Sequence, residues 1–162
     1  MATYFHVSTT DLVAGTVLQP GNWGDRTRHF IDGRSPGTVK DALILTWEAT
    51  LEATRLLANT AAPSRLNCVF ACGQMEDAVT FRDGYRQGAA IYEIEAPDGT
   101  PVHVGDFSLI SVGRPGTMID VWVVGSASYW RDPPAGLKEV LIGGPVTVIK
   151  KCGADGKAED RR

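Results

Sequence analysis

The chain has 162 residues, of which 43% are hydrophobic, and this size and composition suit one domain with a continuous core. Its formal net charge of −3 argues against a protein that coats nucleic acid through a general positive surface. No apolar run approaches the ~20 residues of a membrane span, and the N-terminus lacks the basic stretch and apolar core of a secretion signal, so we expect a soluble, cytoplasmic protein.

The first part of the chain predicts a strand, a loop and a long helix. Residues 3–8 are rich in aromatic and β-branched types, which favours a strand, and residues 11–18 suit a short turn or helix. The stretch from residue 19 to 37 is rich in turn formers and charges, so we predict a long surface loop. Thr38 starts a capping box, with Asp41 in place of the usual glutamate, and apolar residues at helical spacing continue to about Asn59.

The middle of the chain predicts a buried strand over residues 66–72 and a second helix over 75–83. Gly84 is expected to end that helix. Residues 89–95 alternate in polarity as a strand does, and the turn at 97–100 leads into another extended segment, so we predict a β-hairpin.

The last part of the chain is ambiguous at one point. Residues 118–130 fit a strand by propensity and a helix by the spacing of their apolar residues, and we favour the helix. Residues 139–150 predict two strands hinged at 143–145. The whole pattern predicts a single α+β domain over residues 1–152, followed by a polar tail, residues 153–162.

Three cysteines, Cys68, Cys72 and Cys152, make an odd count without the spacing of metal ligands. This pattern supports neither a disulfide framework nor a zinc site. We therefore predict reduced thiols that pack as small apolar groups, and no metal centre.

Three predicted strands each carry one polar group among apolar neighbours. They are Phe5-His6-Val7-Ser8, Val69-Phe70-Ala71-Cys72 and Lys138-Glu139-Val140-Leu141-Ile142. In residue types and order they resemble the ADP-ribosyltransferase superfamily, and specifically its poly(ADP-ribose) polymerase and diphtheria-toxin-like branch with a histidine, a tyrosine and a glutamate. The resemblance implies a split two-sheet fold, with one long helix and short helices around a cleft for NAD.

The resemblance also implies roles for the first and third segments. His6 would bind an NAD ribose hydroxyl, Val7 and Ser8 would help to seat the nicotinamide ribose, and Glu139 would be the catalytic carboxylate. Displacement of nicotinamide passes through a ribosyl cation, and a carboxylate can stabilise such a cation. The arginine-modifying branch has a second acidic residue two positions before the glutamate, but that position is Leu137 here.

The second segment implies that Val69, Phe70 and Ala71 line the same NAD site. The tyrosine that stacks on nicotinamide in the family is replaced by Val69. Another aromatic residue would have to supply the stacking surface, and the candidates are Tyr92, Trp23 and Tyr129.

Three further residues are candidates for the NAD site. Asp106 is a second choice of catalytic carboxylate, although a turn aspartate between Gly105 and Phe107 can simply bind its own backbone. Arg26 and Arg28 could reach a pyrophosphate with bidentate hydrogen bonds, although arginines in a loop are usually solvated.

The resemblance implies NAD-dependent transfer of ADP-ribose to a protein, a nucleic acid or a small molecule that the sequence does not identify. A single small domain suggests a microbial toxin, effector or phage-conflict protein. Such a protein would be cytoplasmic or delivered into a target-cell cytoplasm, and an antitoxin or inhibitor would be its partner. One alternative is an NAD-dependent RNA 2′-phosphotransferase, which the sparse basic content disfavours. Another is a catalytically inactive module that binds nucleotide or protein, which Val69 favours.

Overall fold

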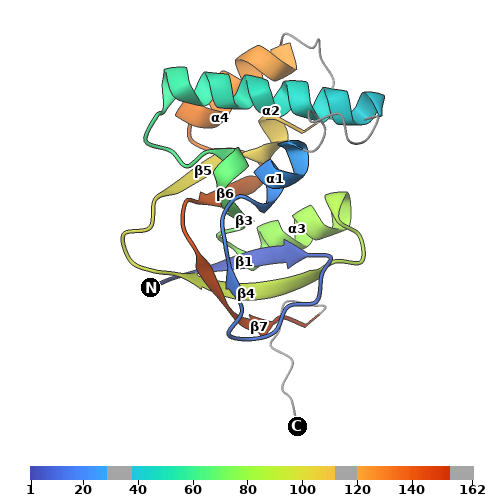
Figure 1. Ribbon diagram of the computed structural model, residues 1–162, viewed down its shortest axis with the longest axis vertical. Coiled ribbons are helices and arrows are strands. Elements are labelled where there is room, and N and C mark those ends of the chain that lie inside the picture. Colours follow the sequence, from blue (N-terminus) through green and yellow to red (C-terminus); the bar gives the residue numbers. More distant parts are fainter. Residues whose placement is uncertain (29–37, 112–119, 154–162) are drawn as a thin grey trace.

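The computed structural model describes residues 1–28, 38–111 and 120–153, which form two antiparallel sheets and a layer of helices (Figure 1). The chain is of mixed α+β class, as predicted. In chain order the elements are β1 (Ala2–Ser8), β2 (Val17–Leu18), α1 (Asn22–Arg28), α2 (Val39–Ala58), the 3₁₀ turn η1 (Arg65–Asn67), β3 (Val69–Ala71), α3 (Met75–Tyr85), β4 (Ala90–Ala96), β5 (Val102–Asp106), the 3₁₀ turn η2 (Phe107–Leu109), the π-helical turn η3 (Asp120–Val124), α4 (Gly125–Arg131), β6 (Lys138–Ile142) and β7 (Val146–Lys151).

The strands divide between two sheets that touch at one point. The first sheet has the order β1-β4-β7-β2, and the second has the order β3-β6-β5. Phe5 of β1 and Cys72, which follows β3, exchange two backbone hydrogen bonds of 2.9 and 2.8 Å. β1 and β3 therefore lie side by side, while the rest of the two sheets separates and packs face to face.

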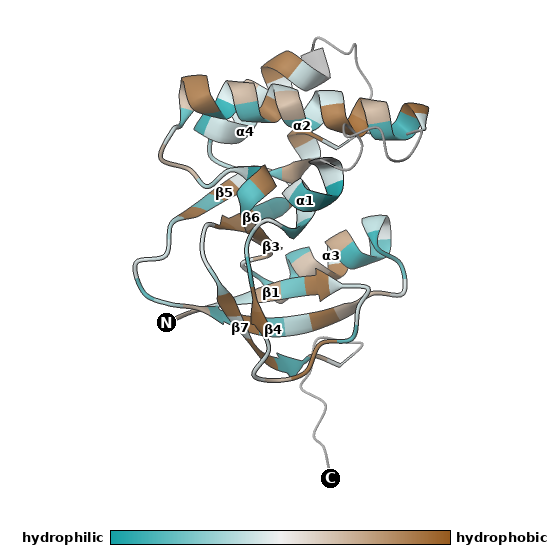
Figure 2. Ribbon diagram, in the orientation of Figure 1, coloured by the Kyte–Doolittle hydropathy of each residue, from teal (hydrophilic) through white to brown (hydrophobic). Residues whose placement is uncertain are grey.

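Each face of the second sheet covers a different core because side chains alternate along a strand. Val140 and Ile142 of β6 point toward the first sheet, where they share a core with Ile94 of β4. Leu141 points the other way, toward Leu51 of α2 and the end of α4. Glu139 shares the parity of Leu141, so its side chain also enters the layer between the sheet and the helices. Figure 2 shows apolar residues along the strands of both sheets and on alternate turns of α2.

Helix α2 begins and ends close to where the sequence predicts. The hydroxyl oxygen of Thr38 accepts a hydrogen bond from the N–H of Asp41 at 3.2 Å, and the Asp41 carboxylate accepts the N–H of Thr38 at 2.8 Å. This reciprocal pair satisfies two N–H groups that a helix start otherwise leaves unpaired. The prediction of a long helix capped at Thr38 is confirmed, as are the two strands either side of residues 143–145.

Several predicted elements are wrong. Residues 97–100 do form a turn, but β4 pairs with β1 and β7 whereas β5 pairs with β6, so the predicted hairpin does not exist. The predicted loop contains α1, and residues 29–37 lie outside the described residues. The predicted strand over 66–72 is shortened to β3 by the turn η1, and α3 continues past Gly84 to Tyr85.

The remaining assignments are closer to the prediction. The segment from Asp120 to Arg131 is helical, first as a π turn and then as α4, while residues 118 and 119 are outside the described part. The three cysteines are buried and unpaired. Among the described residues, no helix has the length and apolarity needed to cross a bilayer.

Candidate functional site

A small pocket opens where β1, β3 and β6 come together with α3 and η2. Its volume is about 40 Å³, which is room for a few water molecules. Most of its lining is apolar, and Glu139 is its one carboxylate. The lining residues are Phe5, Val7, Phe70, Ala71, Cys72, Phe81, Phe107, Leu137, Lys138 and Glu139.

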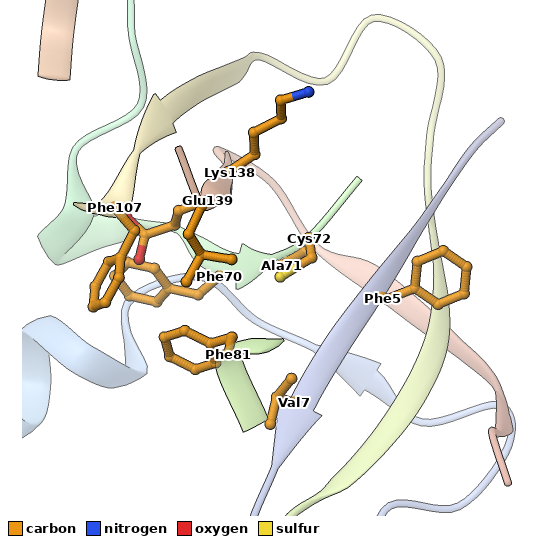
Figure 3. Close-up of a pocket in the computed structure, with 10 residues that line it drawn as sticks. Phe5, Val7, Phe70, Ala71, Cys72, Phe81, Phe107, Lys138 and Glu139 are labelled. Carbon is orange, nitrogen blue, oxygen red and sulfur yellow. The ribbon is translucent and has the colours of Figure 1, made fainter. Parts of the chain in front are cut away.

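Four phenylalanines line the pocket, and three of them lie on the same side as Glu139. In Figure 3 the rings of Phe70 and Phe107 lie beside Glu139, with Phe81 below them, while Lys138 extends away. Phe81 of α3 and Phe107 of η2 meet edge to face, with ring centroids 5.4 Å apart. The pocket is thus a small apolar space with an aromatic wall and one acidic side chain.

The two oxygens of Glu139 have different environments. Oε2 accepts hydrogen bonds from the Tyr129 hydroxyl, at 2.6 Å, and from Nη1 of Arg65. Oε1 has no hydrogen-bond partner among the described residues. The only fully buried polar side-chain atom without a partner in that part of the chain is Nε1 of Trp47, so Oε1 of Glu139 retains some solvent access. Glu139 lines the pocket, and Oε1 is its unpaired oxygen.

Arg65 connects Glu139 to a second buried carboxylate. Its Nε donates to Oε2 of Glu48 at 3.2 Å, and its Nη2 donates to Oε1 of Glu48 at 3.3 Å. Nε1 of Trp23 also donates to Oε1 of Glu48, at 2.9 Å. Glu48, Arg65 and Glu139 are only 5%, 7% and 7% exposed. The guanidinium of Arg65 therefore donates hydrogen bonds to two carboxylates in a largely buried cluster.

Burial changes the proton affinity of the pocket groups. Desolvation raises the pKa of Glu139, and the charge of Glu48 adds to that rise, while Arg65 and the Tyr129 hydroxyl oppose it. Desolvation likewise raises the pKa of the Cys72 thiol to about 12, so this thiol is neutral near pH 7 and is a poor nucleophile.

His6 lies next to the pocket without lining it. Its Nδ1 lies 2.7 Å from the carbonyl oxygen of Phe70. A carbonyl can only accept, so Nδ1 carries the hydrogen and donates it. Burial lowers the pKa of His6, which keeps the ring neutral at pH 7 and leaves Nε2 as an acceptor. Nε2 has no partner among the described residues and keeps solvent access by the same reasoning as Oε1 of Glu139.

The other residues predicted for an NAD site fall into two groups. Val7, Phe70 and Ala71 line the pocket with Glu139. By contrast, the side chain of Val69 packs between the two sheets. The Ser8 hydroxyl is occupied in a local turn with the backbone of Thr10.

Asp106, the second candidate carboxylate, is fully engaged by the backbone. Its oxygens accept N–H groups from Ser108 at 2.9 Å, Ala135 at 3.0 Å and Gly136 at 2.6 Å. Although burial opposes ionisation, these donors hold the pKa of Asp106 below its usual value. The carboxylate therefore fastens the segment before β6 to the end of β5, and both of its oxygens are occupied.

The basic and aromatic candidates lie away from the pocket lining. Arg26 is exposed on α1, and the side chain of Arg28 lies outside the described part. Trp23 reaches the site only indirectly, through Glu48 and Arg65. Tyr92 is buried between the sheets, and its hydroxyl accepts the N–H of Leu12 at 3.1 Å. Tyr129 is fully buried and contacts Glu139 through its hydroxyl.

Four residues in or beside the candidate site escaped the sequence reasoning. Phe81 and Phe107 carried no distinctive pattern. Glu48 had a detectable signal, because it lies three residues before Leu51 and four after Ile44, in the middle of the apolar stripe of the predicted helix. A charged residue at such a position needs a buried partner. That partner is Arg65, which lies between the predicted helix and the predicted strand over residues 66–72.

The sequence model of one protein family, described as "Protein of unknown function (DUF2441)", matches residues 29–154. This match spans more than half of the chain. The chain belongs to the DUF2441 family. No curated protein matches the chain. The DUF2441 match contains Glu48, Arg65, Tyr129 and Glu139, as well as Phe70, Phe81 and Phe107 of the pocket, whereas His6 and Val7 precede it.

Proposed function

We propose that this protein is an NAD-dependent ADP-ribosyltransferase in which Glu139 is the catalytic carboxylate. The observation that carries the proposal is the asymmetry of Glu139. Arg65 and Tyr129 hold Oε2, while Oε1 is left without a partner in an aromatic, largely apolar pocket. A fixed carboxylate oxygen in a site with little water strongly stabilises a developing positive charge.

The arrangement of the strands supports the same proposal. β1 and β3 are the touching strands of the split sheets, and β6 lies beside β3. The three segments that resemble the ADP-ribosyltransferase superfamily are thereby neighbours in space, although more than 130 residues separate His6 from Glu139. The proposed fold is therefore the split two-sheet fold of that superfamily, with the NAD cleft beside the junction of β1 and β3.

His6 and the phenylalanines would have complementary parts in binding NAD. The neutral ring of His6 offers Nε2 as an acceptor for a ribose hydroxyl, at a position fixed by the bond from Nδ1 to the Phe70 carbonyl. Phe81 and Phe107 would supply the stacking surface that Val69 does not. Since the pocket holds only a few waters, these rings must move apart to admit nicotinamide.

The proposed reaction breaks the bond between nicotinamide and C1′ of the ribose, and the electron pair leaves with nicotinamide. Oε1 of Glu139 would stabilise the ribosyl cation and orient the acceptor. The acceptor then forms a new bond to C1′ and loses a proton. The resemblance to the ADP-ribosyltransferase superfamily leaves three classes of acceptor open: a protein, a nucleic acid or a small molecule.

The test is release of nicotinamide from NAD by the wild-type protein and by Glu139→Gln. We expect turnover by the wild type and at least about a 100-fold loss in the variant, because glutamine keeps the shape but removes the charge. Glu93→Gln is the matched control, since Glu93 pairs with Lys150 on β7 away from the pocket. Incubation with labelled NAD and a cell lysate, followed by protease or nuclease digestion, then identifies the class of acceptor.

The result also separates the proposal from its rival. A wild-type protein that binds NAD without releasing nicotinamide would overturn the transferase and support an inactive nucleotide-binding module. Absence of NAD binding in calorimetry would remove both.

A further inference from the structure

The pocket carboxylate belongs to a buried cluster contributed by four elements. Glu48 comes from α2, Arg65 from η1, Tyr129 from α4 and Glu139 from β6. Each of the four is less than 9% exposed. Only Glu139 of these four lines the pocket, so the other three act on the pocket through it.

The contacts within the cluster are unequal. Arg65 donates to Glu48 through two nitrogens at 3.2 and 3.3 Å, and it contacts Oε2 of Glu139 more closely with Nη1. The same Nη1 lies 3.2 Å from the Tyr129 hydroxyl, which itself donates to Oε2 of Glu139. Phe70 lies under the guanidinium, with its ring centroid 4.9 Å from Cζ, so aromatic contact also fixes the plane of Arg65.

The charges within the cluster do not balance. Two carboxylates share one guanidinium, and the two negative charges repel each other strongly because the buried surroundings have a low dielectric constant. The uncharged hydrogen bonds from Tyr129 and Trp23 offset part of the excess. The negative charge of Glu48 is thus placed to act on Glu139 through Arg65, without reaching the pocket itself.

We propose that Arg65 and Glu48 are positioning residues for Glu139: Arg65 orients Oε1 by holding Oε2, and Glu48 holds the guanidinium in place and adds a second negative charge to the buried cluster. This inference rests on the proposed function, because it gives the pair a purpose in the transfer reaction. It makes a prediction about pH that a purely structural role does not make.

The direction follows from the causes acting on Glu139. Burial is the main cause of the raised pKa of Glu139; Arg65 and Tyr129 lower this pKa, and Glu48 raises it further. Removing the charge of Glu48 should therefore lower the pKa of Glu139 and extend activity to lower pH. The other titratable groups nearby are thiols, an imidazole and an exposed amine: Cys68, Cys72, His103 and Lys138.

The experiment compares Glu48→Gln with wild type in two measurements. The first follows the side-chain carboxyl carbons by ¹³C NMR across pH in protein labelled at glutamate, with Glu139→Gln to assign the signal. The second follows kcat/KM for nicotinamide release across pH. We expect the Glu139 titration and the acid limb of the rate profile both to move to lower pH, by about half a unit or more. Glu52→Gln is the matched control, because Glu52 lies one turn further along α2 and pairs with Arg55 instead.

Arg65→Lys tests the orientation separately. Lysine keeps the positive charge but lacks the planar fork that spans the two carboxylates. We expect kcat to fall at least about tenfold with KM nearly unchanged, because the reacting oxygen is misplaced while the binding surface remains. A rise in KM with kcat preserved would overturn this role, because it would mean that Arg65 supports substrate binding and not the position of the reacting oxygen.

The two measurements distinguish the possible failures. If the Glu139 titration and the acid limb stay at their wild-type positions in Glu48→Gln, the inference is overturned while the transferase proposal stands. If wild-type protein releases no nicotinamide, the proposed function is overturned, and the NMR titration alone still shows whether Glu48 and Glu139 are coupled.

Discussion

Replacing Arg65 by methionine should destabilise the fold by an amount that depends on pH. The substitution leaves a side chain of similar length but removes the only cation of the buried cluster. Two bonds to Glu48, one to Glu139 and one contact with the Tyr129 hydroxyl disappear together. Breaking a buried ion pair on one side typically lowers the free energy of unfolding by about 3–5 kcal/mol. Domains of this kind unfold with about 5–15 kcal/mol in total, so the loss is large.

The pH dependence follows from linkage. Desolvation raises the folded-state pKa of Glu139 above its ordinary value of 4.5, so the folded protein holds more protons than the unfolded chain just above that value. Stability therefore falls as pH rises through this window. Loss of Arg65, which lowers that pKa, widens the window upward. Arg65→Met should thus lose more stability at pH 7.5 than at pH 5.

Urea denaturation at the two pH values measures the effect. Arg55→Met is the control. Arg55 pairs with Glu52 and donates to the backbone carbonyls of Thr60 and Ala62, but this group is partly exposed, so its loss should lower the free energy of unfolding by only about 1–2 kcal/mol. Two outcomes would refute the view that buried charge dominates here. One is that the free energy of unfolding of Arg65→Met lies within about 1 kcal/mol of the wild-type value at pH 7.5. The other is that it falls by the same amount at both pH values.

Two further predictions concern the framework around the site. Gly105→Ala should lower the unfolding free energy by about 1–3 kcal/mol, because a Cβ there would lie 2.3 Å from the Tyr129 ring. Gly84→Ala is the control: a Cβ there meets open space within α3, so this change should be neutral or stabilising by up to about 1 kcal/mol. Thermal melts in which Gly84→Ala is the less stable variant would contradict this packing. Asp106→Ala should lower the unfolding free energy by about 2–3 kcal/mol, because three backbone N–H groups lose their acceptor. The lowered pKa of Asp106 means that its contribution is present above pH 3.8 and is lost as pH falls through the folded-state value, so denaturation of the wild type and the variant should converge in strong acid.

Local signals account for the parts of the fold that the sequence predicts well. The capping box of Thr38 and Asp41 involves residues three apart, so its hydrogen bonds follow from the sequence itself. The break at 143–145 is also local, because glycines and a proline interrupt a β-rich segment. Each of these elements would form with the same boundaries in many tertiary settings.

The errors arise where distant residues decide the structure. A turn at 97–100 reverses the chain but does not say which strands pair, and β5 finds β6 in the other sheet. Helix α1 begins in a segment rich in turn formers, and Gly24 allows it to pack directly on the carbonyl of Leu66, where a Cβ would come within 2.0 Å. Leu57, an apolar residue of α2, is 90% exposed, whereas the charged Glu48 of the same helix is buried.

The candidate site shows the same division. The sequence picks out Glu139, Phe70 and Val7, which do line one pocket, because each belongs to a strand with a recognisable local pattern. It misses Arg65, since nothing near this residue in the chain indicates that its partners lie 17 and 74 positions away.

The uneven charge of the cluster links stability to the proposed chemistry. A buried ion network often contributes less to folding stability than apolar residues of the same shape. The second carboxylate of the Glu48–Arg65–Glu139 cluster lowers this contribution further, because it has no second cation to pair with among the described residues. The same excess of negative charge places negative potential beside the pocket, where a ribosyl cation would need it. If that is its purpose, Arg65→Met combined with Glu48→Gln and Glu139→Gln should recover most of the stability that Arg65→Met alone loses and still release no nicotinamide. If this neutral triple variant is as stable as the wild type and also releases nicotinamide, the charges of the cluster are needed neither for folding nor for the reaction.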